Sequence, residues 1–383
     1  MAKQAYVYSG TDWVPLASEV TNLSGYQTKA LNQFPYRNLV INGDMQIAQR
    51  GTSVASITGT GYNTNDRWRM DLGTIGTWTN SVENDAPTGS GFRKSFKVLC
   101  TTADASPASG DFFAVAQDLE GQNVQAIKKG SSAAEQLTIS FWVKANVTGT
   151  YVVELYDNDN TRHTAKQYTV SASATWEYKT ITFAADTTGV LDNDNASSFR
   201  VSFMLGQGSS FTSGTLPTSW ASVTNANRAV GQVNLASATN NYWQVTGVQL
   251  EVGAVATPFE FLPAQQELAQ CQRYYYRIQA SAATMYPSIA TAAVSQTTTN
   301  VIGSIQNPVS MRDVPSSLEW STLAYQRWDG TMFAVSNVGI DANTDTPLGF
   351  MANWTVAATS ASTAGRILGN NSASSYFAVN AEL

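Results

Sequence analysis

Few side chains in this sequence could carry out acid–base or nucleophilic chemistry. His163 is the only histidine, and it follows the polar run 157–162 (DNDNTR), which predicts a solvated loop and not a catalytic dyad. A pair of carboxylates is sufficient for glycoside hydrolysis. The acidic residues that could form such a pair on or near neighbouring predicted strands are Glu154, Asp157, Asp159 and Glu177. We expect these residues to form a charged, solvent-exposed face, and we therefore predict that the protein is not an enzyme.

Two turns rich in side-chain oxygens suggest a calcium site. Calcium binds six to eight oxygens, and the runs 157–160 (DNDN) and 192–195 (DNDN) offer Asp157, Asp159, Asp192 and Asp194 as ligands. Asp and Asn also favour turns without any ion, so this alternative stays open. Zinc is not expected, because only Cys100 and Cys271 accompany the single histidine. We expect both cysteines to be buried free thiols, and we predict no cofactor other than calcium.

A third kind of chemistry is the stacking of a sugar ring on an aromatic side chain. The apolar face of a pyranose packs on Trp or Tyr, while neighbouring polar groups bind the hydroxyls. The aromatic residues in turn-rich contexts are Trp78, Trp220, Tyr325 and Trp328. We predict that these four residues bind glycan, with burial at an interface between subunits as the alternative.

The composition restricts the partners of the protein. The 383 residues are 43% hydrophobic but only 13% charged, and the net charge is −6. A weakly charged, acidic surface does not suit a nucleic-acid backbone, and no apolar run is long enough for a membrane-spanning helix. The start of the sequence also lacks the pattern of a secretory signal. We therefore expect a product made in the cytoplasm that associates with copies of itself.

The hydrophobic pattern predicts an all-β protein with one short helix. Residues 1–36 contain a hairpin that is too small to hold a core. Residues 37–262 alternate in strand fashion between Gly, Asn, Asp and Ser turns, which is typical of a β-sandwich. Residues 263–273 are predicted to form a linker helix that begins after a proline. Residues 274–383 return to strands, and for them we predict a second β-sandwich that forms a tip.

Several motifs resemble a family of phage tail-fibre and fibre-like virion proteins, of the cyanobacterial or marine podovirus type. They are residues 37–53 (RNLVINGDMQIAQRGTS), 66–68 (DRW), 243–253 (WQVTGVQLEVG), 258–260 (PFE), 267–275 (ELAQCQRYY), 308–312 (PVSMR) and 380–383 (NAEL). The start of the chain, residues 5–16 (AYVYSGTDWVPL), resembles the start of such proteins. The segment 37–262 is also similar to the jelly rolls of carbohydrate-binding modules, and by analogy with these modules Asp44 is a further possible calcium ligand. Met45 departs from the family pattern, which has an aromatic residue there.

The resemblance implies a structural protein of the virion. It implies a homotrimer that attaches to other virion proteins through residues 1–36, carries a jelly-roll body and recognises a host surface polysaccharide at its tip during adsorption. Two alternatives remain open at this point. One is a capsid decoration or head-fibre protein with a structural role, and the other is a capsule-degrading spike enzyme.

Overall fold

The computed structural model describes residues 6–8, 13–15, 36–282, 285–341 and 343–383. Strands dominate this part of the chain, and every strand pairing that it contains is antiparallel. The predicted all-β class is therefore confirmed. The predicted N-terminal hairpin is also present, because β1 (Tyr6–Tyr8) pairs with β2 (Trp13–Pro15). The rest of the segment 1–35 lies outside the described residues.

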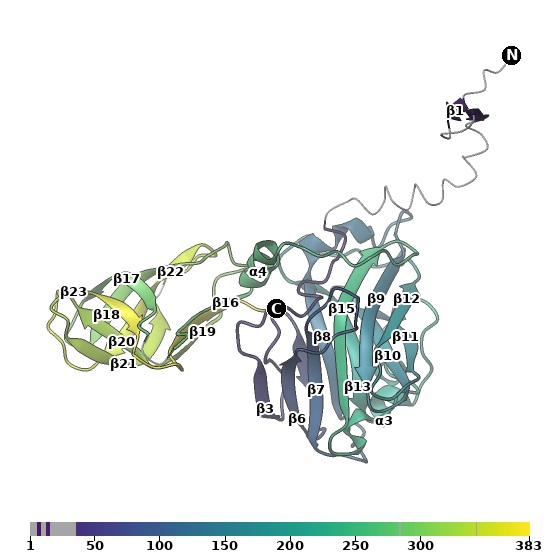
Figure 1. Ribbon diagram of the computed structural model, residues 1–383, viewed down its shortest axis with the longest axis horizontal. Helices are drawn as coiled ribbons and strands as arrows, with labels where there is room; N and C mark the ends of the chain where they lie inside the picture. The colour runs from purple at the N-terminus through teal and green to yellow at the C-terminus, as the bar shows by residue number, and fades with distance from the viewer. Residues whose placement is uncertain (1–5, 9–12, 16–35, 283–284, 342) are drawn as a thin grey trace.

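The larger lobe, which we call the body, is a sandwich of two sheets, as the jelly-roll prediction requires (Figure 1). The seven-stranded sheet has the order β14 (Ala221–Ser222), β11 (Arg162–Val170), β10 (Gly149–Asp157), β13 (Ser197–Gln207), β8 (Phe112–Glu120), β5 (Arg69–Leu72) and β4 (Gly61–Tyr62). The six-stranded sheet has the order β12 (Glu177–Phe183), β9 (Leu137–Ala145), β15 (Tyr242–Val252), β7 (Ser95–Thr102), β6 (Thr77–Glu83) and β3 (Ser53–Ile57). Short helical turns connect the strands: η2 (Gly121–Asn123), η3 (Gln125–Ile127), α3 (Ser209–Thr212), η4 (Asn225–Asn227) and η5 (Leu235–Ser237).

The period-two alternation of the strands explains how the body buries its core. Successive side chains of a strand point to opposite faces of the sheet, so Leu137, Ile139, Phe141 and Val143 of β9 all point to one face, where they are buried. Strands β10 and β13 contribute buried residues in the same way, and the two inner faces form one cluster that extends from Val40 to Leu250. Packing between the two sheets therefore stabilises the body.

The helix α4 (Ala264–Gln272) leads from the body to the second lobe, close to the predicted range. It begins directly after Pro263, whose carbonyl oxygen accepts hydrogen bonds from the backbone N–H groups of Gln266 at 2.8 Å and Glu267 at 3.2 Å. Proline suits this position because the first turn of a helix has no intrahelical partner for its N–H groups. Cys271 lies on the buried side of α4, and it is a free thiol, as is the buried Cys100.

The second lobe, which we call the barrel lobe, is not the predicted β-sandwich. A three-stranded sheet, β16 (Tyr275–Gln279), β24 (Tyr376–Asn380) and β19 (Ser317–Ser321), joins a closed barrel. The barrel has the order β17 (Ser288–Ser295), β18 (Asn300–Gln306), β22 (Gly349–Val356), β21 (Met332–Ile340), β20 (Leu323–Arg327) and β23 (Ala364–Gly369), and β23 pairs back with β17. Closure gives every barrel strand two neighbours, so no barrel edge is left open. Alternation predicts strands but not their closure, which depends on the pairing of β17 with β23.

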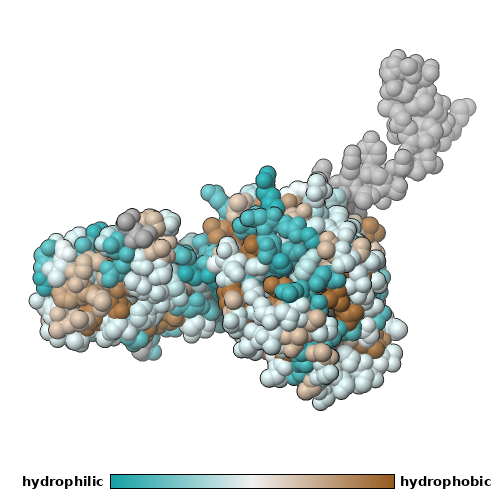
Figure 2. Space-filling model, turned by 60° about the horizontal axis from the view of Figure 1, so that its bottom comes forward, coloured by the Kyte–Doolittle hydropathy of each residue, from teal (hydrophilic) through white to brown (hydrophobic). Residues whose placement is uncertain are grey.

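The barrel lobe has a hydrophobic core of its own, which extends from Tyr276 to Ala381. The C-terminal end of the chain returns to the space between the body and the barrel lobe (Figure 1). The face shown in Figure 2 is mostly pale, with separate hydrophobic areas on both lobes, which fits the weakly charged composition. Within the described residues, no helix is long and apolar enough to cross a membrane.

Candidate functional site

Three of the four aromatic residues that were predicted to bind glycan are buried. Trp78 and Tyr325 have no exposed surface, and Trp220 is 8% exposed. Their polar atoms are already paired: Trp78 Nε1 donates to the Ile75 carbonyl at 2.7 Å, Trp220 Nε1 to the Ala184 carbonyl at 3.0 Å, and the Tyr325 hydroxyl to the Thr363 carbonyl at 2.6 Å. The prediction was wrong for these three because a ring inside a core cannot stack on a ligand. Tyr325 belongs to β20, so it is not a turn residue as we had expected.

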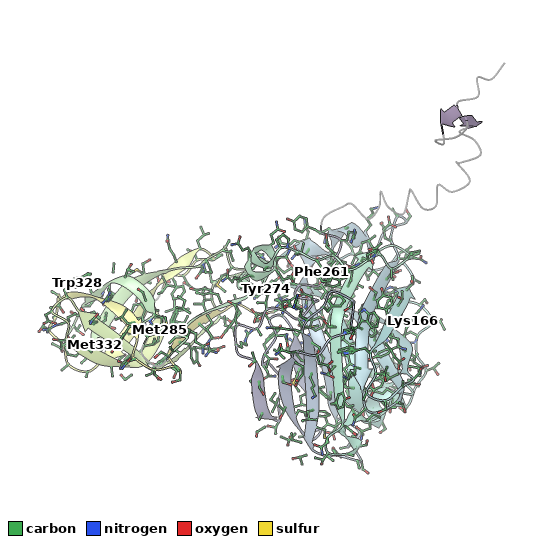
Figure 3. All side chains as sticks on the ribbon, in the orientation of Figure 1. Lys166, Phe261, Tyr274, Met285, Trp328 and Met332 are labelled. Atoms are coloured by element: carbon green, nitrogen blue, oxygen red, sulfur yellow. The ribbon has the colours of Figure 1, made fainter. Side chains whose placement is uncertain are left out.

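The fourth residue, Trp328, is 70% exposed. It lies in the turn between β20 and β21, at the end of the barrel that is farthest from the body (Figure 3). The Gly330 N–H donates to the Arg327 carbonyl at 3.0 Å, and the left-handed φ of Gly330, +88°, suits glycine in this tight turn. The turn therefore holds the indole out from the barrel, where stacking on a ligand is sterically open.

A shallow hollow of about 350 Å³ lies beside this indole. It is lined by Arg327, Trp328, Asp329, Ser360, Thr363 and Ala364. Arg327 and Asp329 form an ion pair, and Arg327 Nη1 also donates to the Ser360 hydroxyl at 3.3 Å. The hydrogen bond from Arg327 holds the pKa of the Asp329 carboxyl well below its usual value. The hollow, which we call the tip site, thus offers an aromatic plane, a guanidinium group, a carboxylate and two hydroxyls.

A second group of polar side chains lies on the outer face of the seven-stranded sheet, away from the core of the sandwich. Arg69 pairs with Asp71 at 2.6 Å and with Asp118 at 3.0 Å, and Arg200 pairs with Asp118 at 2.7 Å. Beside them, Arg228 binds both oxygens of the buried Glu154 carboxylate at 2.7 to 3.2 Å. These charged groups therefore already satisfy one another.

Aromatic rings surround Arg228 on this face. The guanidinium carbon lies 5.3 Å from the ring centroids of Phe112 and Tyr156 and 5.9 Å from that of Phe211. A hollow of about 370 Å³ opens here, lined by Thr60, Asp71, Leu72, Gly73, Phe112, Arg200, Phe211 and Arg228. The sequence analysis missed this sheet-face hollow. Its residues come from six separate segments with no motif in common, so nothing in the local sequence pointed to it.

His163 and the four candidate catalytic carboxylates, those of Glu154, Asp157, Asp159 and Glu177, do not come together in one site. His163 is not in a solvated loop: it is buried on β11, and its Nδ1 lies 2.9 Å from Glu154 Oε1. Burial alone would raise the pKa of Glu154, but the hydrogen bonds from His163 and Arg228 lower it. Glu177, which we had expected on a free charged face, pairs with Lys179 at 2.6 Å. Each carboxylate is therefore held by a different partner.

Three of the four predicted calcium ligands, Asp157, Asp159 and Asp194, already bind protein groups through their carboxylates, and Asp192 is exposed. Asp157 is fully buried and pairs with the ammonium group of Lys129. Asp159 accepts the backbone N–H of Asp192 at 2.8 Å, and Asp194 accepts that of Ala196 at 2.9 Å. In the part of the chain that the structure describes, no group of three or more Cys, His, Asp or Glu side chains is arranged to hold a metal. The two oxygen-rich turns are held by a lysine and by backbone N–H groups, so these residues form no preformed calcium site.

Asp44, the further calcium ligand suggested by analogy, lies beside another acidic residue. Burial raises the pKa of the Asp44 carboxyl, and the backbone N–H of Gln46, a donor at 3.3 Å, opposes that shift. Burial raises the pKa of Glu267 on α4, and the nearby charge of Asp44 adds to that shift. Glu267 accepts the backbone N–H of Asn42, so it fixes the turn that precedes Asp44.

Comparison with known proteins gives only structural similarities. No protein-family model and no curated protein matches this chain. The enzymatically active domain of tailspike protein 4 of bacteriophage CBA120 is similar over 57% of this chain and 22% of its own, with 14% identity and a TM-score of 0.31. The match thus spans about a fifth of that tailspike chain.

Carbohydrate-binding modules also appear among the similar structures. A family 4 module is similar over 55% of this chain and 97% of its own, with 15% identity and a TM-score of 0.28. A family 11 module of Clostridium thermocellum, solved with a mixed-linked tetrasaccharide, is similar over 54% of this chain and 98% of its own, with 12% identity and a TM-score of 0.28. Membership of the phage fibre-like family stays a prediction.

Proposed function

We propose that this protein is a fibre-like phage virion protein that recognises its host receptor by binding glycan at the tip site. The observation that carries the proposal is the 70% exposure of Trp328 beside the Arg327–Asp329 ion pair. An indole this exposed gains nothing from the barrel core, whereas a sugar ring would cover its apolar face. The guanidinium, the carboxylate and the Ser360 and Thr363 hydroxyls supply donors and acceptors for sugar hydroxyls.

The sheet-face hollow is a second place where the same function could reside. Phe112, Phe211 and Tyr156 offer apolar rings, and Arg228 and Arg200 offer donors. These three rings are only partly exposed, whereas Trp328 is 70% exposed and offers a freer stacking plane. We therefore place the main glycan contact at the tip site.

The proposal is tested by binding of the purified protein to polysaccharide from candidate host surfaces. Replacing Trp328 with Ala removes the stacking plane, and a stacked aromatic contributes about 1 kcal/mol, or roughly a fivefold loss of affinity per site. Tyr178→Ala is the matched control, because Tyr178 is 47% exposed on the body. Phe211→Ala tests the sheet-face hollow in the same assay, because it removes a ring of the hollow and leaves the Arg228–Glu154 pair in place. Binding that survives Trp328→Ala but disappears with Phe211→Ala would move the site to the body, and binding that survives both would contradict the proposal.

The place of the protein in a virion is part of the same proposal. We expect residues 1–36 to attach the protein to other virion proteins, and the lobes to assemble as a homotrimer whose three tips bind a surface together. Light scattering gives the mass of the assembly, and a monomer mass at micromolar concentration would contradict the trimer. Deleting residues 1–36 should prevent incorporation into particles. The two alternative functions predict other outcomes. A capsid decoration protein would stabilise capsids without affecting adsorption to the host. A capsule-degrading spike would cleave the polysaccharide.

A further inference from the structure

A buried cation in the body faces a carboxylate from the far end of the chain. Arg67, between β4 and β5, has no exposed surface, and its Nη2 donates to the Asp118 carbonyl at 2.6 Å. Within the described ranges, the carboxylate in contact with its guanidinium is that of Glu382, which is 315 residues away and 5% exposed. Burial alone would lower the pKa of Arg67, but the neighbouring Glu382 charge reverses that effect. The body therefore depends on a residue of the segment 380–383 to balance an internal charge.

The segment 380–383 is held from both sides. On the body side, Arg50 pairs with Glu382 at 3.3 Å, and the Tyr62 hydroxyl donates to a Leu383 oxygen at 3.1 Å. On the barrel-lobe side, Arg312 donates to the carbonyls of Ala381 at 2.9 Å and Glu382 at 3.2 Å. The segment thus bridges the two lobes, and it is visible between them in Figure 1.

The residues that lead from α4 into the barrel lobe also contact the body. Arg67 lies 3.5 Å from the centroid of the Tyr274 ring, and Arg50 lies 3.6 Å from that of the Tyr275 ring. Arg273 binds both oxygens of the buried Glu120 at 2.7 and 2.8 Å, and the Tyr274 hydroxyl also donates to Glu120. Tyr274 is labelled at the junction of the lobes in Figure 3.

We propose that the body and the barrel lobe fold as one cooperative unit, stabilised by the buried contact of Glu382 with Arg67, so that a chain lacking this carboxylate has a loosened body and a weakened junction between the lobes, where the Arg273–Glu120 pair remains. The reason is the cost of an unpaired buried charge: breaking one partner of a buried ion pair is far more damaging than replacing both partners by neutral groups. This inference goes beyond the proposed glycan binding and does not depend on it. The stability of the body then depends on its contacts with the barrel lobe, although each lobe has a hydrophobic core of its own.

Calorimetry and small-angle scattering on the full chain test the inference. The unaltered protein should unfold in a single transition. Glu382→Gln keeps the shape but removes the charge, and it should split this transition and lower the midpoint of the body by roughly 10 °C. The radius of gyration should increase at the same time. Glu135→Gln is the control, because Glu135 pairs with Lys128 on the surface, where the two side chains are 41% and 53% exposed, and it should change neither measurement.

A double variant separates the charge from the shape of the site. Arg67→Gln with Glu382→Gln removes both charges of this pair, while Arg50, which also loses Glu382, keeps its contacts with the Tyr62 and Tyr275 rings. The double variant should restore much of the midpoint and the single transition. If Glu382→Gln yields no folded protein, recovery of folding in the double variant supports the proposal, and failure of both contradicts it. Two separate transitions in the unaltered protein, or a Glu382→Gln protein identical to the control, would also overturn it.

Discussion

The ammonium group of Lys129 lies in contact with the carboxylate of Asp157, inside the body and almost without exposed surface. A second carboxylate, that of Asp186, lies 2.9 Å from the same nitrogen, and the Trp220 ring lies 4.9 Å from it. Asp157 is one of the residues for which the sequence predicted calcium. The positive charge at this place is therefore a lysine of the chain itself.

We predict that Lys129→Gln destabilises the protein by about 3–5 kcal/mol, because it leaves Asp157 buried without its cation. The adjacent Lys128→Gln is a matched control, since Lys128 forms an exposed pair with Glu135 and should contribute less than about 1 kcal/mol. Urea unfolding monitored by tryptophan fluorescence measures both. Calcium and a chelator should leave the midpoint of the unaltered protein unchanged, and a rise with calcium would support the ion-site prediction.

Stability should fall as the pH rises from about 4.5 to 7. Burial raises the pKa of Glu267 from 4.5 to about 7, with Asp44 and Glu260 adding to the shift and the Asn42 N–H opposing it. In that pH range the folded state binds the proton more tightly than the unfolded state, so this stabilisation is complete below pH 4.5 and is lost as the pH passes 7. Between these pH values, titration of Glu267 lowers the free energy of unfolding by up to about 3 kcal/mol. Asp66, with its pKa raised by burial to about 6, acts in the same direction.

The measurement is the unfolding free energy from pH 4.5 to 8 for the unaltered protein and for Glu267→Gln. The variant keeps an acceptor for the Asn42 N–H, so it should be more stable at pH 8 and depend less on pH. Glu135→Gln should follow the unaltered curve. Equal slopes for Glu267→Gln and the unaltered protein would show that Glu267 does not titrate in this range.

Tyr325 should affect the stability of the barrel and not the binding of glycan. Tyr325→Ala should cost about 3–5 kcal/mol because it empties part of the barrel core. Tyr325→Phe should cost about 1 kcal/mol, since it removes only the hydrogen bond to the Thr363 carbonyl. Chemical unfolding gives the stability, and binding per folded molecule should be unchanged for Tyr325→Phe. A loss of affinity in that variant without a loss of stability would place the hydroxyl in the tip site.

The sequence alone determined most of the secondary structure. The strand pattern predicted for residues 37–262 agrees with strands such as β9, β12 and β15, because the period of side-chain direction is a local property of a strand. Pro263 likewise marked the start of α4. The turn that exposes Trp328 was also recognisable, since Asp329 and Gly330 favour a turn wherever it lies in the fold.

The tertiary structure decided which face of each strand is buried and what lies opposite it. Trp78 and Tyr325 look like binding residues in the sequence, yet the pairing of distant strands places both in cores. The motifs around Arg50, Arg67, Tyr274 and Glu382 are spread over the chain, and only the packing of two lobes brings them into contact. Closure of the barrel and the pairing of Lys129 with Asp157 also depend on contacts between residues that are distant in the sequence. A local pattern fixes the direction of a side chain, whereas burial and charge balance depend on neighbours that are distant in the sequence.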